Sequence, residues 1–147
     1  MQVRIIDPIK SNQLSLKKVC AYVRVSTANI SQGLSLENQA EYFERTIKAN
    51  PEYEFVGIFS DNGTTGTKAD RPEFQRMLSL AESDGIDIIL TKSISRFARN
   101  TVDLLEIVRK LKSLNVEVRF EEERINTLNG DGELMLTVLS SFAQEES

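Results

Sequence analysis

The chain has 147 residues, of which 40% are hydrophobic and 27% charged, a balance that suits one soluble globular domain and excludes a disordered chain. It has no histidine, which excludes serine hydrolysis that depends on an imidazole base. Its single cysteine, Cys20, is expected in a buried strand and excludes an internal disulfide and a cysteine cluster for zinc. The net charge of −4 argues against a free-standing nucleic-acid binder. The sequence has no long apolar run, which excludes a membrane span or a secretory signal. The cytoplasm is therefore the expected compartment.

The first predicted strand, residues 18–26, has two chemically different faces. Residues 1–17 before it show no clear period and are expected to form an N-terminal extension. Side chains alternate along a strand, so Ala21, Val23 and Val25 point one way. The other face carries Tyr22, Arg24 and Ser26. The first face predicts core, whereas the phenol, cation and hydroxyl of the second require polar partners.

Helices and strands then alternate along the chain. The apolar residues of the first helix recur at helical spacing: Leu36, Ala40, Phe43 and Ile47. Ser35 is its predicted N-cap, and residues 53–61 predict the second strand. Asp70, with Glu73 three residues later, predicts the start of a second helix. Residues 87–91 predict the third strand.

The second half continues the same alternation. Residues 92–100 are expected to form a loop, followed by a helix from about Thr101 and a fourth strand over 116–120. This order predicts an α/β fold, with a mainly parallel sheet of about four to five strands and helices on both faces. Residues 18–130 then form the α/β domain, and residues 131–147 begin a long helix that is expected to continue past the end of this chain.

Polar side chains follow three of the predicted strands, and the carboxyl ends of parallel strands meet at one edge of a sheet. The candidates on this edge are Ser26, Asp61, Ser95, Arg96 and Arg99, with Arg24 one step behind and Arg71 at the start of the second helix. Arginines grouped around a serine, without histidine, suit an anionic substrate, because guanidinium groups donate bidentate hydrogen bonds to phosphate and keep their charge. The sequence therefore predicts a phosphate site.

Each candidate also has a purely structural interpretation. Ser26 alone is most often a turn or helix-entry residue, and Arg24 alone could form a buried ion pair with Asp61. Arg96 and Arg99 could be a solvated helix start. The phosphate-loop pattern of nucleotide-binding proteins is absent, which disfavours a small-molecule phosphotransferase. A non-catalytic α/β regulatory or assembly module stays open as the alternative, and convergence of the arginines around one pocket would favour catalysis.

Several linked motifs resemble the catalytic domain of serine recombinases, the resolvase/invertase family. These are "YVRVST", "LSLENQ", "FSDNGTTGT", "DRPEFQRML", "KSISRFARN" and "SSFAQEES", which follow in order from about Lys18 to Ser147. Their spacing and the "SRFARN" form are more similar to the large serine recombinases of phages and mobile elements than to the small resolvases. The resemblance implies a three-layer α/β/α fold that ends in a long C-terminal dimerisation helix.

The resemblance also implies an activity. Ser26 would attack a DNA phosphodiester, forming a 5′-phosphoserine link that is resealed after strand exchange without metal, ATP or other cofactor. By position, the phosphate-binding arginines would be Arg24, Arg96 and Arg99, with Arg71 as a further active-site arginine. Residues in supporting positions would be Tyr22, Gln39, Asp61 and Thr65. The implied partners are double-stranded DNA sites and further copies of the protein, as a dimer and as a tetramer in the synaptic complex, with no membrane.

The chain departs from the small resolvases at two positions. Ser95 stands where they carry aspartate, just before Arg96, and Leu34 stands where they carry glutamine. Asp61 is then the only carboxylate predicted at the site, and the group that deprotonates Ser26 stays open. Because arginine is a poor general base, we expect the arginines to lower the pKa of the hydroxyl electrostatically. Most of the DNA affinity is expected from domains beyond residue 147.

Overall fold

The structure is a computed structural model. It describes residues 16–25, 36–62, 71–130, 132–135 and 137–138. Among these residues, no helix combines the length and the apolar character that crossing a membrane requires.

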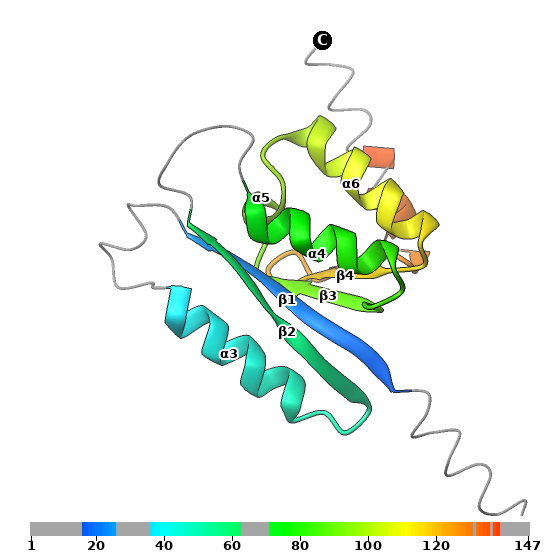
Figure 1. The fold of residues 1–147 in the computed structure, drawn as a ribbon. Coiled ribbons are helices and arrows are strands. Elements are labelled where there is room, and N and C mark those ends of the chain that lie inside the picture. The colour runs from blue at the N-terminus through cyan, green and yellow to red at the C-terminus, as the bar shows by residue number, and fades with distance from the viewer. Residues whose placement is uncertain (1–15, 26–35, 63–70, 131, 136, 139–147) are drawn as a thin grey trace, which may run out of the picture.

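A single five-stranded sheet forms the centre of the domain (Figure 1). Its strands lie in the order β2-β1-β3-β4-β5, with β1 at Lys17–Val25, β2 at Tyr53–Asn62, β3 at Ile88–Thr91, β4 at Glu117–Phe120 and β5 at Ile125–Asn126. The first four strands are mutually parallel, and β5 pairs antiparallel with β4. The predicted α/β fold with a mainly parallel sheet is therefore confirmed. The strand β5 was not predicted individually, because its two residues are too few to show the alternation of a strand.

Helices cover both faces of the sheet, as predicted, but unequally (Figure 1). On one face, α3 at Leu36–Lys48 is the only helix among the described residues, and it packs against β1 and β2. On the other face lie α4 at Pro72–Glu82, α5 at Ile94–Phe97 and α6 at Thr101–Ser113. The apolar stripes of α4 and α6 bury Phe74, Met77, Leu104 and Leu111, as their helical spacing requires.

The side chains of β1 alternate as predicted, but both of its faces belong to the core. Val19, Ala21 and Val23 pack with Phe43 and Ile47 beneath α3. Cys20 and Tyr22 point the other way, into the larger cluster beneath α4 and α6. The expectation that Tyr22 lies on a polar face was therefore wrong in part: its ring is completely buried, and only its hydroxyl needs a polar partner.

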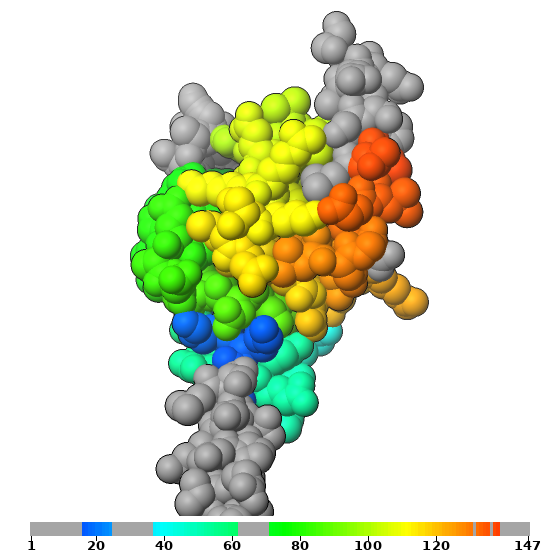
Figure 2. Space-filling view, turned by 90° about the vertical axis from the view of Figure 1, so that its right-hand side faces the viewer, coloured from blue at the N-terminus to red at the C-terminus, as the bar shows by residue number. Residues whose placement is uncertain are grey.

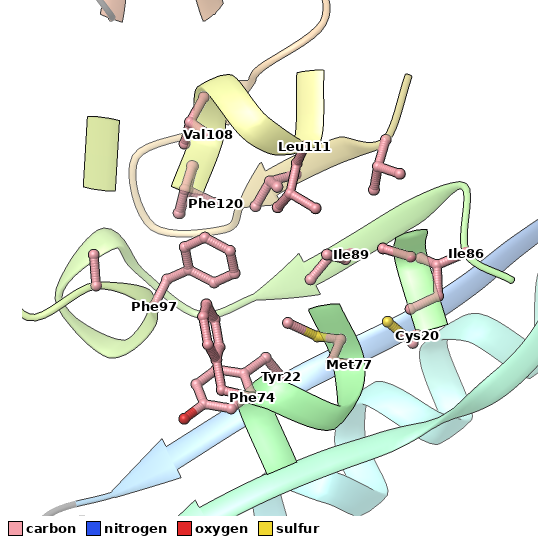
Figure 3. Packing of buried hydrophobic residues seen from close by; sticks show 14 of the residues in the cluster. Cys20, Tyr22, Phe74, Met77, Ile86, Ile89, Phe97, Val108, Leu111 and Phe120 are labelled. Atoms are coloured by element: carbon pink, nitrogen blue, oxygen red, sulfur yellow. The ribbon is translucent and has the colours of Figure 1, made fainter. Parts of the chain in front are cut away.

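Four aromatic rings connect the elements around the carboxyl edge of the sheet (Figure 3). Tyr22 of β1 packs edge-to-face on Phe74 of α4, with ring centroids 5.0 Å apart. Phe74 packs on Phe97 of α5 at 5.2 Å, and Phe97 on Phe120 of β4 at 5.5 Å. Each such pair adds about 0.5–1.5 kcal/mol beyond its area burial. The row fixes the short helix α5 against the strands.

Two local predictions required correction. The N-cap residue of α4 is Arg71 instead of Asp70, and its side chain makes no capping hydrogen bond. The segment 92–100, expected to be a loop, contains α5, which at four residues is too short to show a helical period. The predicted cap Ser35 lies outside the described residues.

The chain after β5 returns to α6. Residues 132–135 and 137–138 are helical, and the rest of the predicted last helix lies outside the described residues. Figure 2 shows α6 side by side with the residues that follow β4, and Lys112 of α6 pairs with Glu133. Met135 is buried in the same core cluster as Leu111. This part of the segment therefore contributes to the domain's own core.

Candidate active site

Asp61, next to the last residue of β2, is held by three hydrogen bonds. Its carboxylate accepts from the Tyr22 hydroxyl at 2.8 Å and from the backbone amides of Glu73 and Phe74, each at 3.1 Å. The two amides belong to the first turn of α4, where helix amides lack partners in the helix itself. Asp61 therefore caps α4 and anchors Tyr22, and the alternative in which it forms an ion pair with Arg24 is wrong.

The Tyr22 hydroxyl is kept protonated by this environment. Burial raises the pKa of Tyr22 above its usual range, and the hydrogen bond and negative charge of Asp61 raise it further, against opposing effects of Arg71 and Arg24. Tyr22 therefore acts as a hydrogen-bond donor to Asp61 at any physiological pH. Its role in the site is to position the strand and the carboxylate.

Arg24 and Arg96 are interlocked through each other's backbone. Arg24 donates from Nε to the carbonyl of Arg96 at 3.2 Å and from Nη2 to the carbonyl of Ser95 at 2.6 Å. Arg96 donates in return from Nη1 to the carbonyl of Arg24 at 2.6 Å. Both side chains are half-buried. The carboxyl end of β1 and the helix α5 are thus joined by three hydrogen bonds, and both guanidinium groups lie at the predicted edge.

Arg71 is the buried member of the group. It is 6% exposed and donates from Nη2 to the carbonyl of Phe97 at 2.9 Å. Its guanidinium lies 3.7 Å from the centroid of the Phe74 ring, a cation–π contact. Among the described residues, Nη1 has no hydrogen-bond partner. The buried Nη1 group is thus not used by any residue that the structure describes.

The charges of these arginines act on one another. Burial is the main cause that lowers the pKa of Arg71; Tyr22 and Asp103 oppose the shift, and the positive charges of Arg24 and Arg99 add to it. The positive charges of Arg24 and Arg99 thus disfavour the charged form of Arg71. A dianionic or monoanionic group placed between them would relieve this repulsion.

Arg99 lies at the mouth of an open pocket. Arg24, Ser95, Arg99 and Glu123 are among the residues that line this pocket, whose volume is about 520 Å³. Arg99 is exposed, and its Nε lies 3.8 Å from the Asp103 carboxylate in the next turn. The Ser95 side chain is also exposed, with Oγ 3.1 Å from the buried Ser93 Oγ. The structure thus places Arg24 and Arg99 at one pocket, beside the Arg96 side chain that is joined to Arg24.

Gln39 lines a different pocket from Arg24 and Arg99. It is on α3, and it lines a second pocket of about 360 Å³ together with Tyr42, Lys92 and Glu121. Its Oε1 is buried and has no hydrogen-bond partner among the described residues. The two pockets share no lining residue in the described part of the chain. The supporting role expected for Gln39 stays a prediction.

Two predicted site residues, Ser26 and Thr65, lie outside the described residues, as does Leu34. Ser26 directly follows Val25, the last residue of β1, and is two residues from Arg24.

Glu123 is a residue of this edge that the sequence did not lead us to predict. It follows β4, lines the arginine pocket, and accepts a hydrogen bond from the Ile94 backbone amide at 3.2 Å through Oε1. The signal was available: the rule that gathers loops at the carboxyl edge of a parallel sheet applies to β4 as well as to the three strands considered. Asp61 is therefore not the only carboxylate at this edge.

Comparisons with known proteins identify the family of the chain. The family model described as "Resolvase, N terminal domain" matches residues 19–147. The transposon Tn3 resolvase of Escherichia coli is 32% identical over 129 residues, which are 88% of this chain and 63% of that protein. The chain thus spans somewhat less than two thirds of the length of this curated relative.

Solved structures show the same fold. A resolvase family site-specific recombinase from Streptococcus pneumoniae is 34% identical, with a TM-score of 0.73 over 88% of this chain and 87% of that one. The N-terminal catalytic domain of TP901-1 integrase is 29% identical, with a TM-score of 0.73 over 88% of this chain and 96% of that one. Because the family model covers almost all of the described residues, the chain belongs to the resolvase family and corresponds to its N-terminal domain.

Proposed function

We propose that this chain is the catalytic domain of a site-specific recombinase that cuts and rejoins DNA through Ser26. The observation that carries the proposal is the interlocked pair of Arg24 and Arg96 at the carboxyl end of β1. This pair, with Arg99 at the same pocket, presents fixed positive charge next to the chain position of Ser26. The names of the similar proteins, a resolvase, a recombinase and an integrase, support the same function.

The proposed reaction is a phosphoryl transfer with a covalent intermediate. The Ser26 oxygen forms a new bond to phosphorus while the bond from phosphorus to the 3′ oxygen of the DNA breaks. The serine proton leaves to solvent, and the departing 3′ oxygen takes up a proton. Because one phosphoester replaces another, the reverse attack by a 3′ hydroxyl reseals a strand without an energy source.

The arginines have distinct parts in this proposal. Arg24, Arg96 and Arg99 neutralise the charge that develops on the non-bridging phosphate oxygens, and phosphoryl transfer is catalysed almost entirely by such charge stabilisation together with positioning. Arg71 acts from the buried side by holding the Phe97 carbonyl, which fixes the end of α5. Asp61 accepts three hydrogen bonds from Tyr22 and α4, so in this proposal it positions the site and does not carry the proton.

The proposed partners are double-stranded DNA and further copies of the protein. Recombination between two duplex sites requires two cuts at each, which we assign to paired subunits that assemble as a tetramer. The net charge of −4 disfavours strong phosphate binding by these 147 residues alone. We therefore expect the domain to contribute catalysis and the main DNA affinity to come from other parts of the full-length protein.

The covalent intermediate provides the test. We expect the natural full-length protein, incubated with a plasmid carrying the DNA that adjoins its coding sequence, to become linked to the cut 5′ end. Ser26→Ala should abolish the adduct, because no other hydroxyl is proposed to attack. Ser79→Ala, a change of the same size on the exposed side of α4, should leave it intact. An adduct that persists in Ser26→Ala contradicts the assignment, and a wild-type protein that never forms one supports the non-catalytic alternative.

A further inference from the structure

Two of the helices that begin at the carboxyl edge of the sheet, α4 and α5, have no side-chain cap from their own N-cap residue. The N-cap residue of α4 is Arg71 and that of α5 is Ser93, and neither side chain makes a capping hydrogen bond. In α4 the missing acceptor is supplied from a distance by Asp61, at the end of β2. In α5 it is supplied from a distance by Glu123, after the end of β4. Carboxylates at or just after strand ends therefore replace the usual caps in both helices.

The helix α5 determines where Arg24 lies. The carbonyls of Ser95 and Arg96, both in α5, accept the two hydrogen bonds of the Arg24 guanidinium. The side chain of Arg96 leaves the same helix and returns to the Arg24 carbonyl. A shift of α5 by a fraction of an ångström would therefore move both guanidinium groups. Transition-state stabilisation depends on donors held in place before the reaction, so such a shift is costly.

Glu123 is itself held by a fixed turn. The backbone amide of Glu121 donates to the carbonyl of Thr91 at 3.0 Å, and that of Glu122 to the carbonyl of Lys92 at 2.8 Å. Arg124 adopts a left-handed conformation with φ of 59°, and its amide donates to the Phe120 carbonyl at 2.7 Å. The turn 121–124 thus connects the end of β4 to the segment that enters α5.

We propose that Glu123 is a positioning residue for the Arg24–Arg96 pair. Its carboxylate acts through the Ile94 amide: it holds the first turn of α5 and thereby the two carbonyls that orient Arg24. It requires an acceptor oxygen and not a negative charge, so an amide side chain at this position fulfils the same role. This inference rests on the proposed recombinase function, because the pair it positions is the one assigned to the phosphate.

The first test measures the hydrogen bond without DNA. Amide exchange of Ile94 and of the Arg24 Nε proton is followed by NMR in Glu123→Ala and Glu123→Gln. We expect exchange in Glu123→Ala to be about fivefold faster, the change that corresponds to the loss of one hydrogen bond of about 1 kcal/mol. Glu123→Gln should exchange like the wild type. Glu122→Ala, in the same turn, keeps its backbone bond to Lys92 and serves as the matched control with unchanged exchange.

The second test measures cleavage by the full-length protein at saturating DNA. We expect Glu123→Ala to cut about tenfold more slowly with unchanged DNA affinity, and Glu123→Gln and Glu122→Ala to stay within about twofold of the wild type. Wild-type exchange and cleavage in Glu123→Ala would overturn the inference. Equal loss in Glu123→Gln would overturn it too, by showing that the charge is needed. A wild type without any Ser26 adduct would overturn the proposed function and this role together, although the exchange result would still show whether Glu123 holds α5.

Discussion

Arg24 and Arg96 each hold the other's backbone: the Arg24 Nε donates to the Arg96 carbonyl at 3.2 Å, and the Arg96 Nη1 donates to the Arg24 carbonyl at 2.6 Å. A substitution of either residue removes one guanidinium, leaves the backbone carbonyl that the other arginine uses, and weakens the connection between β1 and α5 that holds both in place. The two residues form one unit that connects β1 to α5. Its energetic consequences differ from those of two independent phosphate ligands.

The first prediction is that the two arginines are not additive. We expect Arg24→Ala and Arg96→Ala each to lower the cleavage rate by at least about 10²-fold, the effect of losing one preorganised donor. The double variant should lose little more than the worse single variant, because each change already loosens the connection between β1 and α5 that positions the remaining guanidinium. Single-turnover cleavage at saturating DNA measures all three.

Arg76→Ala is the control for this comparison of single and double variants. Arg76 is an exposed arginine of α4 that pairs with Glu73 at 2.8 Å, so its removal changes the net charge equally without touching the pair. Its cleavage rate should match the wild type. Losses that multiply in the double variant would show that Arg24 and Arg96 act separately.

The second prediction concerns Asp61 as a structural acceptor. Asp61→Ala leaves the Tyr22 hydroxyl and two amides of α4 without their acceptor, so we expect a loss of about 2–4 kcal/mol in the free energy of unfolding. Tyr22→Phe removes one donor and leaves the other two, and should cost about 1 kcal/mol. Urea unfolding measures both. Glu82→Gln, which weakens an exposed ion pair with Lys110, should change stability by less than about 0.5 kcal/mol. A loss in Asp61→Ala no larger than that control would contradict the capping role.

The third prediction is a fall of stability in alkaline solution. Burial raises the pKa of Cys20 and of Tyr22 above their usual values of 9.0 and 10.0. The unfolded chain therefore loses these protons at a lower pH than the folded chain, and the free energy of unfolding decreases as pH rises above about 9. Below the unfolded pKa values, the contribution of both groups is fully present.

Urea midpoints between about pH 8 and about pH 10.5 measure this slope. Cys20→Ala should remove the part that begins near pH 9, and Tyr22→Phe the part that begins near pH 10. Both substitutions also change packing at every pH, so the slope and not the absolute midpoint is the relevant quantity. If both variants show the same slope as the wild type, neither group loses its proton at a lower pH in the unfolded chain than in the folded chain.

The sequence was sufficient for the mainly parallel sheet and for the arginines at its edge, but not for the way the arginines are held. The alternation in 18–26 predicts the faces of β1, and the rule for strand ends predicts that Arg24, Arg96 and Arg99 meet. The acceptors of Arg24 are backbone carbonyls, which every residue has, so no sequence pattern identifies them. They lie in α5, whose four residues are too few for a helical period.

The cap of α4 shows a second limit. Asp70 and Glu73 match a local start signal, and such a signal reports only on neighbouring residues. The acceptor that the structure uses, Asp61, lies 12 residues before Glu73 and reaches it because β2 ends beside the helix. The same holds for Glu123 and Ile94, which are 29 residues apart. Contacts of this kind follow from the tertiary arrangement and become visible only with it.

The fourth prediction tests the connection after β5. Gly132 is buried, and a methyl group in place of its hydrogen would overlap the backbone of Thr127. Thr127 has no room to move, because it is 1% exposed and its side-chain oxygen accepts a hydrogen bond from the Val118 amide at 2.9 Å. Gly132→Ala should therefore cost about 1–3 kcal/mol by overpacking and displace the buried Met135. Gly130→Ala, where nothing lies within 4 Å, should change stability by less than about 1 kcal/mol. Urea unfolding and the NMR shift of the Met135 methyl group measure the two effects, and equal behaviour of the two variants would show that the chain relaxes around Thr127.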